Sequence, residues 1–126
     1  MKHVISALFI ITGLINFAPI TGVLSADILA SAYGIATPEG DLLILLRHRA
    51  LLFGIVGGLL LVAAFRRPLR PVATIAGMIS MIGFIALVLM DSGHGDRLQR
   101  IMLIDVGAVI ALALAAFLHP RQSASR

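Results

Sequence analysis

Five polar residues of types that can do chemistry stand within the long apolar runs of this 126-residue chain: Asn16, Arg47, His48, Arg49 and Asp105. A carboxyl group such as that of Asp105 can act as an acid or a base. The guanidinium group of an arginine can bind a carboxylate through two parallel hydrogen bonds. We therefore expect Asp105 to pair with Arg47 or Arg49. These two arginines point about 200° apart on a helix, so the other one is expected to extend toward lipid headgroups.

Each of these residues also has a purely structural interpretation. An arginine–aspartate pair near a membrane interface can simply clasp two helices or anchor their topology. Asn16 can be a hydrogen-bonding group between helices, or else a ligand contact. His48 faces a third direction and is expected to do no chemistry, and Pro19 is expected to kink the end of its helix.

The segment Gly93-His94-Gly95-Asp96 resembles a fragment of a nucleotidyl-transfer histidine motif. Such a site needs an α/β phosphate-binding scaffold whose strands lead into helix N-termini, and nothing in the sequence supplies one. We therefore interpret the segment as a glycine-rich turn and expect no adenylyltransferase activity. His94, Asp91 and Asp96 could approach one metal ion, but their spacing matches no standard metal site. The chain also has no cysteine, so we expect neither a metal nor another cofactor.

The composition excludes most soluble functions. Hydrophobic residues make up 60% of the chain and charged residues 13%, and the mean hydropathy is +1.05. An ordinary soluble domain carries about 25% charged residues, because water must wet its surface. The net charge is +4, but with no Trp and one Tyr the sequence lacks the features of a nucleic-acid-binding surface. The chain is therefore expected to meet lipid rather than water.

Four runs are long enough to cross a membrane as helices, which takes about 20 apolar residues each. We predict an all-α, integral membrane four-helix bundle that forms one transmembrane domain, residues 1–126, with helices at about 4–24, 38–65, 71–90 and 98–118. The runs are too long and alternate too little for barrel strands. Leu24 stands where a cut after Ala26 would need a small residue, so we expect the first run to be retained.

The connections carry their own signals. Residues 27–33 are expected to form a short interfacial helix. Thr37 and Pro38 look like the N-cap and first residue of the second long helix, and Pro71 is suited to open the third.

Charge predicts the orientation. With four helices, both termini and the middle loop share one side, which holds no acid and these basic residues: Lys2, Arg66, Arg67, Arg70, Arg121 and Arg126. Cytoplasmic loops are enriched in Lys and Arg, so we expect both termini in the cytoplasm. All six acids then lie in the outer half, together with the polar cluster. Polar groups at membrane depth usually face the bundle interior or a cavity.

Small residues indicate which helix faces pack together. Ala50, Gly54 and Gly58 form a stripe that permits close helix packing, and a row of alanines follows Asp105 on the fourth helix. We therefore expect Asp105 to point at neighbouring helices rather than at lipid.

The sequence resembles a group of small bacterial four-helix membrane proteins, the DoxX-like and DUF4345-like families. The resemblance spans nearly the whole chain and is carried by these stretches: residues 16–24, Tyr33-Gly34, residues 45–50, residues 52–54 and Asp105. Members are often labelled phosphopantetheine adenylyltransferase in automated naming, a label these residues do not support. The resemblance implies a fold and a location in the bacterial inner membrane, but no reaction.

The leading hypothesis for function is a multi-pass inner-membrane protein whose outer half contains a polar pocket for a membrane lipid or another small amphipathic or apolar molecule. One alternative is a membrane-embedded, isomerase-like enzyme that uses Asp105 as acid or base. Others are a small oligomeric transporter and an accessory subunit of a larger membrane partner. The sequence leaves open whether the chain forms a homo-oligomer.

Overall fold

A computed structural model describes the backbone of residues 1–124 and the side chains of residues 1–119. Every regular element in the described part is a helix: α1 (Lys2–Phe17), η1 (Ala18–Val23), α2 (Ala26–Tyr33), α3 (Gly40–Phe65), η2 (Arg67–Leu69), α4 (Arg70–Met90) and α5 (Asp96–Ala124). Four stretches are long and apolar enough to cross a membrane: Lys2–Val23, Gly40–Phe65, Arg67–Met90 and Asp96–His119. The prediction of an all-α four-helix membrane bundle is confirmed.

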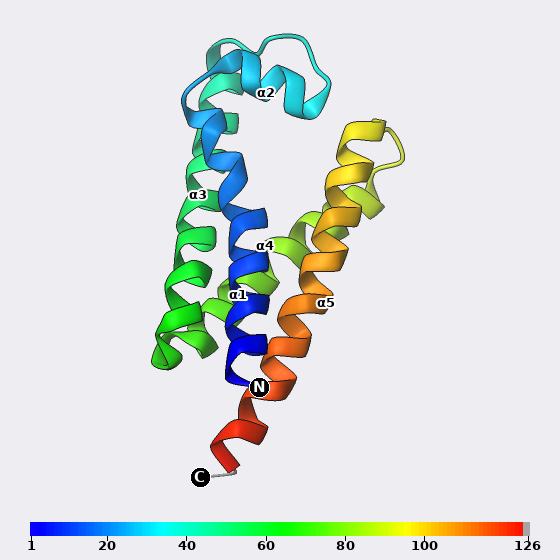
Figure 1. The fold of residues 1–126 in the computed structure, drawn as a ribbon. Helices are drawn as coiled ribbons and strands as arrows, with labels where there is room; N and C mark the ends of the chain where they lie inside the picture. Colours follow the sequence, from blue (N-terminus) through cyan, green and yellow to red (C-terminus); the bar gives the residue numbers. More distant parts are fainter. Residues whose placement is uncertain (125–126) are drawn as a thin grey trace.

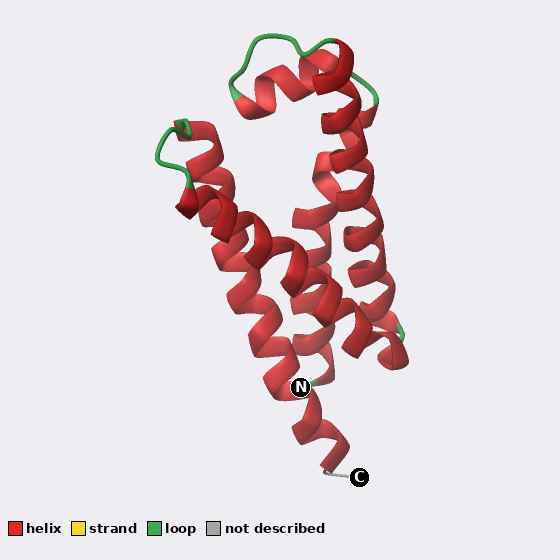
Figure 2. Ribbon diagram, turned by 180° about the vertical axis from the view of Figure 1, so that it is seen from behind, coloured by secondary structure: helices red, strands yellow, loops and turns green. Residues whose placement is uncertain are grey.

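The four long helices form a ring. α1 packs on α3 and α5, and α4 packs on the same two helices from the other side. Helices that follow one another along the chain run in opposite directions, as Figure 1 shows. α4 crosses the bundle obliquely, so α4 and α5 draw away from α1 and α3 toward one end (Figure 2). α2 lies across that end, which we call the α2 end, and the N-terminus lies at the opposite end.

The helix boundaries differ from the expected ones where local chemistry intervenes. Regular α-helix in the first span stops at Phe17 and continues as a 3₁₀ helix that contains Pro19. Proline has no N–H for an i−4 bond and its ring clashes with the preceding turn, which explains the change. The fourth long helix continues beyond the expected residue 118 to Ala124.

The expected N-cap of α3 is wrong. α3 begins at Gly40, its N-cap residue is Glu39, and no side chain caps it. Thr37 instead donates its hydroxyl to Asp27 Oδ1 over 3.5 Å, which links the loop to α2. α2 itself is capped by Ser25, whose Oγ accepts from the two backbone N–H groups of Asp27 and Ile28.

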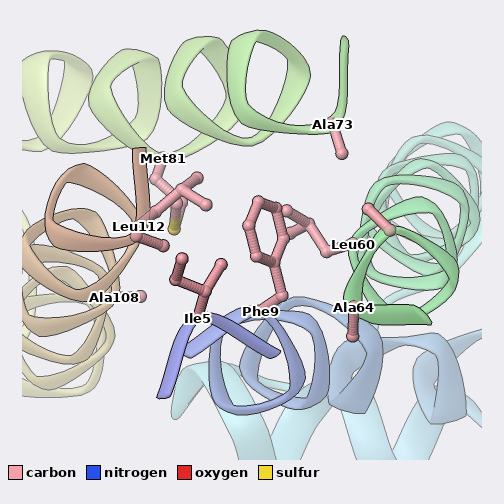
Figure 3. Close-up of a cluster of buried hydrophobic side chains, with 10 residues drawn as sticks. Ile5, Phe9, Leu60, Ala64, Ala73, Met81, Ala108 and Leu112 are labelled. Carbon is pink, nitrogen blue, oxygen red and sulfur yellow. The ribbon is translucent and has the colours of Figure 1, made fainter. Parts of the chain in front are cut away.

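The hydrophobic core occupies the half of the bundle near the N-terminus. Figure 3 shows Ile5 and Phe9 of α1 pointing toward Leu60 of α3, Met81 of α4 and Leu112 of α5. All five side chains are fully or almost fully buried. The other half of the bundle contains the three cavities that Arg49 lines, so the tightly packed half supports a looser one.

The close packing of α1 against α3 depends on a different glycine from the expected one. Gly57 faces the backbone of Phe17 so closely that a Cβ would collide with it, whereas a Cβ on Gly58 would meet nothing within 4 Å. The buried stripe on α3 therefore consists of Ala50, Gly54 and Gly57. Spacings of four and three residues keep these positions on one face of a helix with 3.6 residues per turn.

Candidate functional site

A cavity of about 310 Å³ opens between α1 with η1, α2, α3 and α5, at the α2 end of the bundle. We call it the Asp105 cavity. It is open on one side, and these residues line it: Ile15, Asn16, Ala18, Pro19, Thr21, Ala32, Tyr33, Arg49, Phe53, Ile101, Ile104 and Asp105. Most of the wall is apolar, and the polar groups come from five different elements. This is the usual composition of a small-molecule site.

Asp105 lies at this cavity on the inner face of α5. The side chain is only 6% exposed, as expected for a residue that points into the bundle. It continues the buried face formed by Ala108, Leu112 and Ala115 at helical spacing. Its Oδ2 is buried and has no hydrogen-bond partner, and a buried oxygen without a partner is costly. A group that enters the cavity with a donor can therefore satisfy it.

Arg49 reaches the same cavity from α3, but the expected ion pair is not formed. Within residues 1–119, no arginine nitrogen lies within 4 Å of an Asp105 carboxyl oxygen. Arg49 Nη1 instead donates to the hydroxyl of Tyr33 at 2.8 Å. Its guanidinium carbon lies 5.3 Å from the centre of the Tyr33 ring and 4.9 Å and 4.8 Å from the rings of Phe53 and Phe84. Three aromatic rings thus hold this cation beside the cavity.

Asn16 completes the polar side of the cavity. It is 2% exposed, and its Nδ2 donates to the carbonyl of Thr12 at 2.9 Å and to Met81 Sδ at 3.4 Å. The second bond joins α1 to α4, as expected for a hydrogen-bonding group between helices. Its Oδ1 is buried without a partner, like Oδ2 of Asp105. The residue therefore serves both the packing and the cavity.

Arg47 and His48, which the sequence groups with this cluster, lie elsewhere. Both side chains are exposed, and neither lines the Asp105 cavity. Arg47 stands two residues before Arg49, and this spacing turns the two side chains about 200° apart on the helix. The structure therefore brings together Asn16, Arg49 and Asp105 and leaves the other two outside.

Arg49 also lines two further cavities. One of about 300 Å³ lies between α3 and α4, and one of about 450 Å³ extends past Tyr33 to the loop between α4 and α5. Phe84 lines both of them. Arg49 and its aromatic neighbours thus stand between the Asp105 cavity and the space on the α4 side.

Sequence reasoning missed the aromatic partners of Arg49 as site residues. Phe53 had a signal, because it follows Arg49 by four residues and shares its helix face. Tyr33 is the only tyrosine of the chain, and its hydroxyl is a natural partner for a cation in an apolar setting. Phe84 comes from another helix, and no spacing within the sequence connects it to Arg49.

The turn between α4 and α5 is organised by His94. Its Nδ1 lies 2.6 Å from the carbonyl oxygen of Asp91, and its Nε2 lies 2.7 Å from Oε1 of Gln99. Both ring nitrogens face acceptors, which favours the doubly protonated ring. These two hydrogen bonds, with the backbone one first, raise the pKa of His94 above its usual 6.5.

Comparison of the chain with models of protein families, with curated proteins and with solved structures finds no match to any of them. The resemblance to DoxX-like and DUF4345-like proteins therefore stays a prediction from the sequence. The case for a function depends on the geometry of the cavity itself.

Proposed function

We propose that this protein binds the polar head of a small amphipathic molecule, such as a membrane lipid, in the Asp105 cavity. The observation that carries the proposal is the position of a buried carboxyl oxygen without a partner, on the wall of an otherwise apolar cavity that is open to one side. An apolar wall with a few convergent polar groups suits a ligand with a small polar head and an apolar body.

The polar side chains that line the cavity determine which hydrogen-bonding groups the polar head of the ligand must carry. Asp105 and Asn16 each present a buried oxygen that lacks a donor, so the head needs N–H or O–H groups. Arg49 is engaged by Tyr33 through one nitrogen and keeps further donors for an acceptor on the head. A head that carries both an amine and a phosphate meets both requirements. The volume of about 310 Å³ suits a head, with the tails remaining outside in the bilayer.

We also propose the bacterial inner membrane as the location, with both termini in the cytoplasm. Four helices of sufficient length and apolarity support a multi-pass protein. The basic residues near the N-terminal end and the acids near the α2 end support this orientation through the positive-inside rule. The Asp105 cavity then lies in the outer half of the membrane.

Native mass spectrometry of the full chain in a mild detergent tests the proposal, with lysophosphatidylethanolamine as the added probe. We expect the wild type to retain one molecule of probe, and Asp105→Asn to retain roughly 10-fold less, because it loses a charged hydrogen bond. The matched control is Asp41→Asn, which changes an exposed acid outside this cavity and should bind as the wild type does.

A second pair of variants tests the cavity without touching its charges. Ala32→Trp fills the wall of the cavity, whereas Ala36→Trp adds the same side chain to the exposed loop that follows α2. We expect only the first to abolish retention of the probe. Equal retention by both variants, together with wild-type retention by Asp105→Asn, would overturn the proposal.

The unpartnered oxygen of Asp105 also favours a second candidate function, an isomerase-like enzyme in which this carboxyl moves a proton on an apolar substrate. The test is to incubate membranes that contain the protein in D₂O. Mass spectrometry then measures the masses of the amphipathic molecules that co-purify with the protein. Deuterium at a carbon position in the wild type, and none with Asp105→Asn, supports catalysis. Absence of deuterium in both leaves binding as the function and removes the enzyme.

A further inference from the structure

A separate cavity lies at the opposite end of the bundle from the Asp105 cavity, and the inference drawn from it does not depend on the function proposed above. It has a volume of about 270 Å³ and is lined by Phe9, Arg70, Pro71, Thr74, Ile75, Ala116 and His119. We call it the Arg70 cavity. Its walls come from α1, α4 and α5, close to the turn between α3 and α4.

Arg70 is the most deeply buried basic residue described, at 3% exposure. Its Nε donates to the carbonyl of Ala63 at 3.1 Å, and its Nη2 donates to the carbonyl of Ala64 at 3.0 Å and to Oγ of Ser6 at 3.1 Å. These bonds satisfy carbonyls in the last turn of α3 and join that turn to α1 and α4. They account for two of the three nitrogens of the guanidinium.

The third nitrogen of Arg70, Nη1, is buried and has no hydrogen-bond partner. Phe9 lies against the cation, with its ring centre 5.5 Å from the guanidinium carbon, but a ring face does not replace a hydrogen-bond acceptor. His119 lines the same cavity, and its Nδ1 is also buried without a partner. An acceptor group in this cavity would satisfy Nη1 of Arg70, and it would also satisfy Nδ1 of His119 in the tautomer that carries its proton on that atom.

The surroundings make that group an anion. Arg67 stands three residues before Arg70 and adds a further positive charge to this end of the chain. Five of the six acids lie in α2, in the loops before α3 and after α4, or in the first turns of α3 and α5, and the sixth, Asp105, lines the cavity at the α2 end. Burying a guanidinium without a counter-charge is costly, and no acidic side chain of the chain supplies one here. Thr74 adds a hydroxyl to the wall.

We infer that the Arg70 cavity binds a phosphate group. A phosphate offers several acceptor oxygens in different directions, which suits donors that come from two helices. The apolar side chains of Phe9, Ile75 and Ala116 provide a surface for the organic part of a headgroup. The phosphate can be that of an anionic membrane lipid or a free phosphate, and the experiment separates these two sources.

The test uses native mass spectrometry of the full chain in detergent. The added probes are phosphatidylglycerol and phosphatidylcholine with the same acyl chains. We expect one phosphatidylglycerol to be retained at least roughly 10-fold better than phosphatidylcholine, since the second lipid carries its own cation. Displacement of phosphatidylglycerol by millimolar inorganic phosphate identifies free phosphate as a competent ligand, and lack of displacement identifies the lipid. Equal retention of the two lipids overturns the inference.

Three variants locate the retained lipid. His119→Phe keeps a ring of similar shape but removes the nitrogen, and we expect it to retain roughly 10-fold less phosphatidylglycerol. Arg70→Lys keeps the positive charge but removes the guanidinium group with its several donors, and this variant should also retain less phosphatidylglycerol. Arg66→Gln is the matched control, because it removes an exposed charge from the same turn outside the cavity, and it should bind as the wild type does.

Two outcomes of this series contradict the inference. If Arg66→Gln weakens retention as much as His119→Phe does, attraction to the whole basic end explains the lipid and the cavity does not. If Asp105→Asn releases phosphatidylglycerol while His119→Phe retains it, the lipid occupies the other cavity. The Asp105 variant is otherwise expected to leave phosphatidylglycerol in place, so failure of one site is distinguishable from failure of the other.

Discussion

Arg49 and Asp105 line one cavity from α3 and α5, yet the guanidinium of Arg49 donates to Tyr33 and not to the carboxyl of Asp105. The tyrosine hydroxyl and three aromatic rings hold the arginine on its own side of the cavity. A direct ion pair would satisfy both charges and leave little reason for a ligand to enter. By keeping them apart, the aromatic groups leave the carboxyl oxygen available.

Tyr33→Phe is predicted to destabilise the protein by about 1 kcal/mol, because it removes one hydrogen bond to a charged group and keeps the ring. Reversible denaturation in mixed detergent micelles measures the change in the free energy of unfolding. A double-mutant cycle with Arg49→Met isolates the contact, since both changes remove the same interaction. We expect Tyr33→Phe to have almost no effect once Arg49 is replaced, and an undiminished effect would contradict the contact.

Asp105→Leu is predicted to stabilise the protein by about 1–3 kcal/mol while it abolishes ligand retention. The gain comes from removing a buried carboxyl oxygen that has no partner. The same denaturation experiment measures it. Asp41→Leu is the control, because Asp41 is exposed in the first turn of α3, where a negative charge is favourable and its loss brings no gain. A loss of stability with Asp105→Leu would show that the carboxyl is satisfied.

The sequence was sufficient to predict the membrane bundle, because four apolar runs of spanning length allow few other folds. It also predicted that Asp105 faces the interior, since helical spacing places this position on the packed face. Of the two roles that the sequence left open for Asn16, the structure shows the hydrogen bond between helices. It placed Arg47 and His48 in the cluster because they are neighbours of Arg49 in the chain. Nearness in the chain does not decide which side of a helix faces the cavity.

The role of Arg70 could not be predicted from the sequence. It stands in a basic turn with Arg66 and Arg67 and looks like one more topology signal. The structure buries it because the turn folds back, so that the side chain meets the open carbonyls at the end of α3. Ser6, which lies 64 positions away, provides another acceptor. Such a contact depends on how the helices meet and not on any local pattern.

The turn between α4 and α5 is predicted to weaken as the pH rises. Its hydrogen bonds raise the pKa of His94 above the usual 6.5, so the folded state binds the proton more tightly than the unfolded state does. The stabilisation is then fully present below a pH of about 6.5 and is lost as the pH rises through the higher folded pKa. Amide hydrogen exchange of this turn at about pH 6 and about pH 8.5, corrected for the intrinsic rate, measures the loss.

The control for this prediction is His94→Gln, which keeps a polar side chain but does not titrate. Its turn should show the same protection from exchange at both pH values. Gln99→Leu removes one of the two acceptors and should move the midpoint of the transition to lower pH. A wild-type midpoint at or below 6.5 would contradict the prediction.

Gly57→Ala and Gly58→Ala are predicted to have opposite effects on stability, although they are adjacent on α3. A Cβ at Gly57 collides with the backbone N and Cα of Phe17, and backbone atoms cannot move aside as a flexible side chain can. We expect a loss of about 2 kcal/mol or more as α1 and α3 are pushed apart. A Cβ at Gly58 meets nothing within 4 Å, and alanine favours the helix by up to about 1 kcal/mol. Unfolding in mixed micelles distinguishes the two variants. Similar losses of stability for the two variants would mean that α1 packs on a different face of α3. In that case Asn16 of α1 would not lie beside the Asp105 cavity.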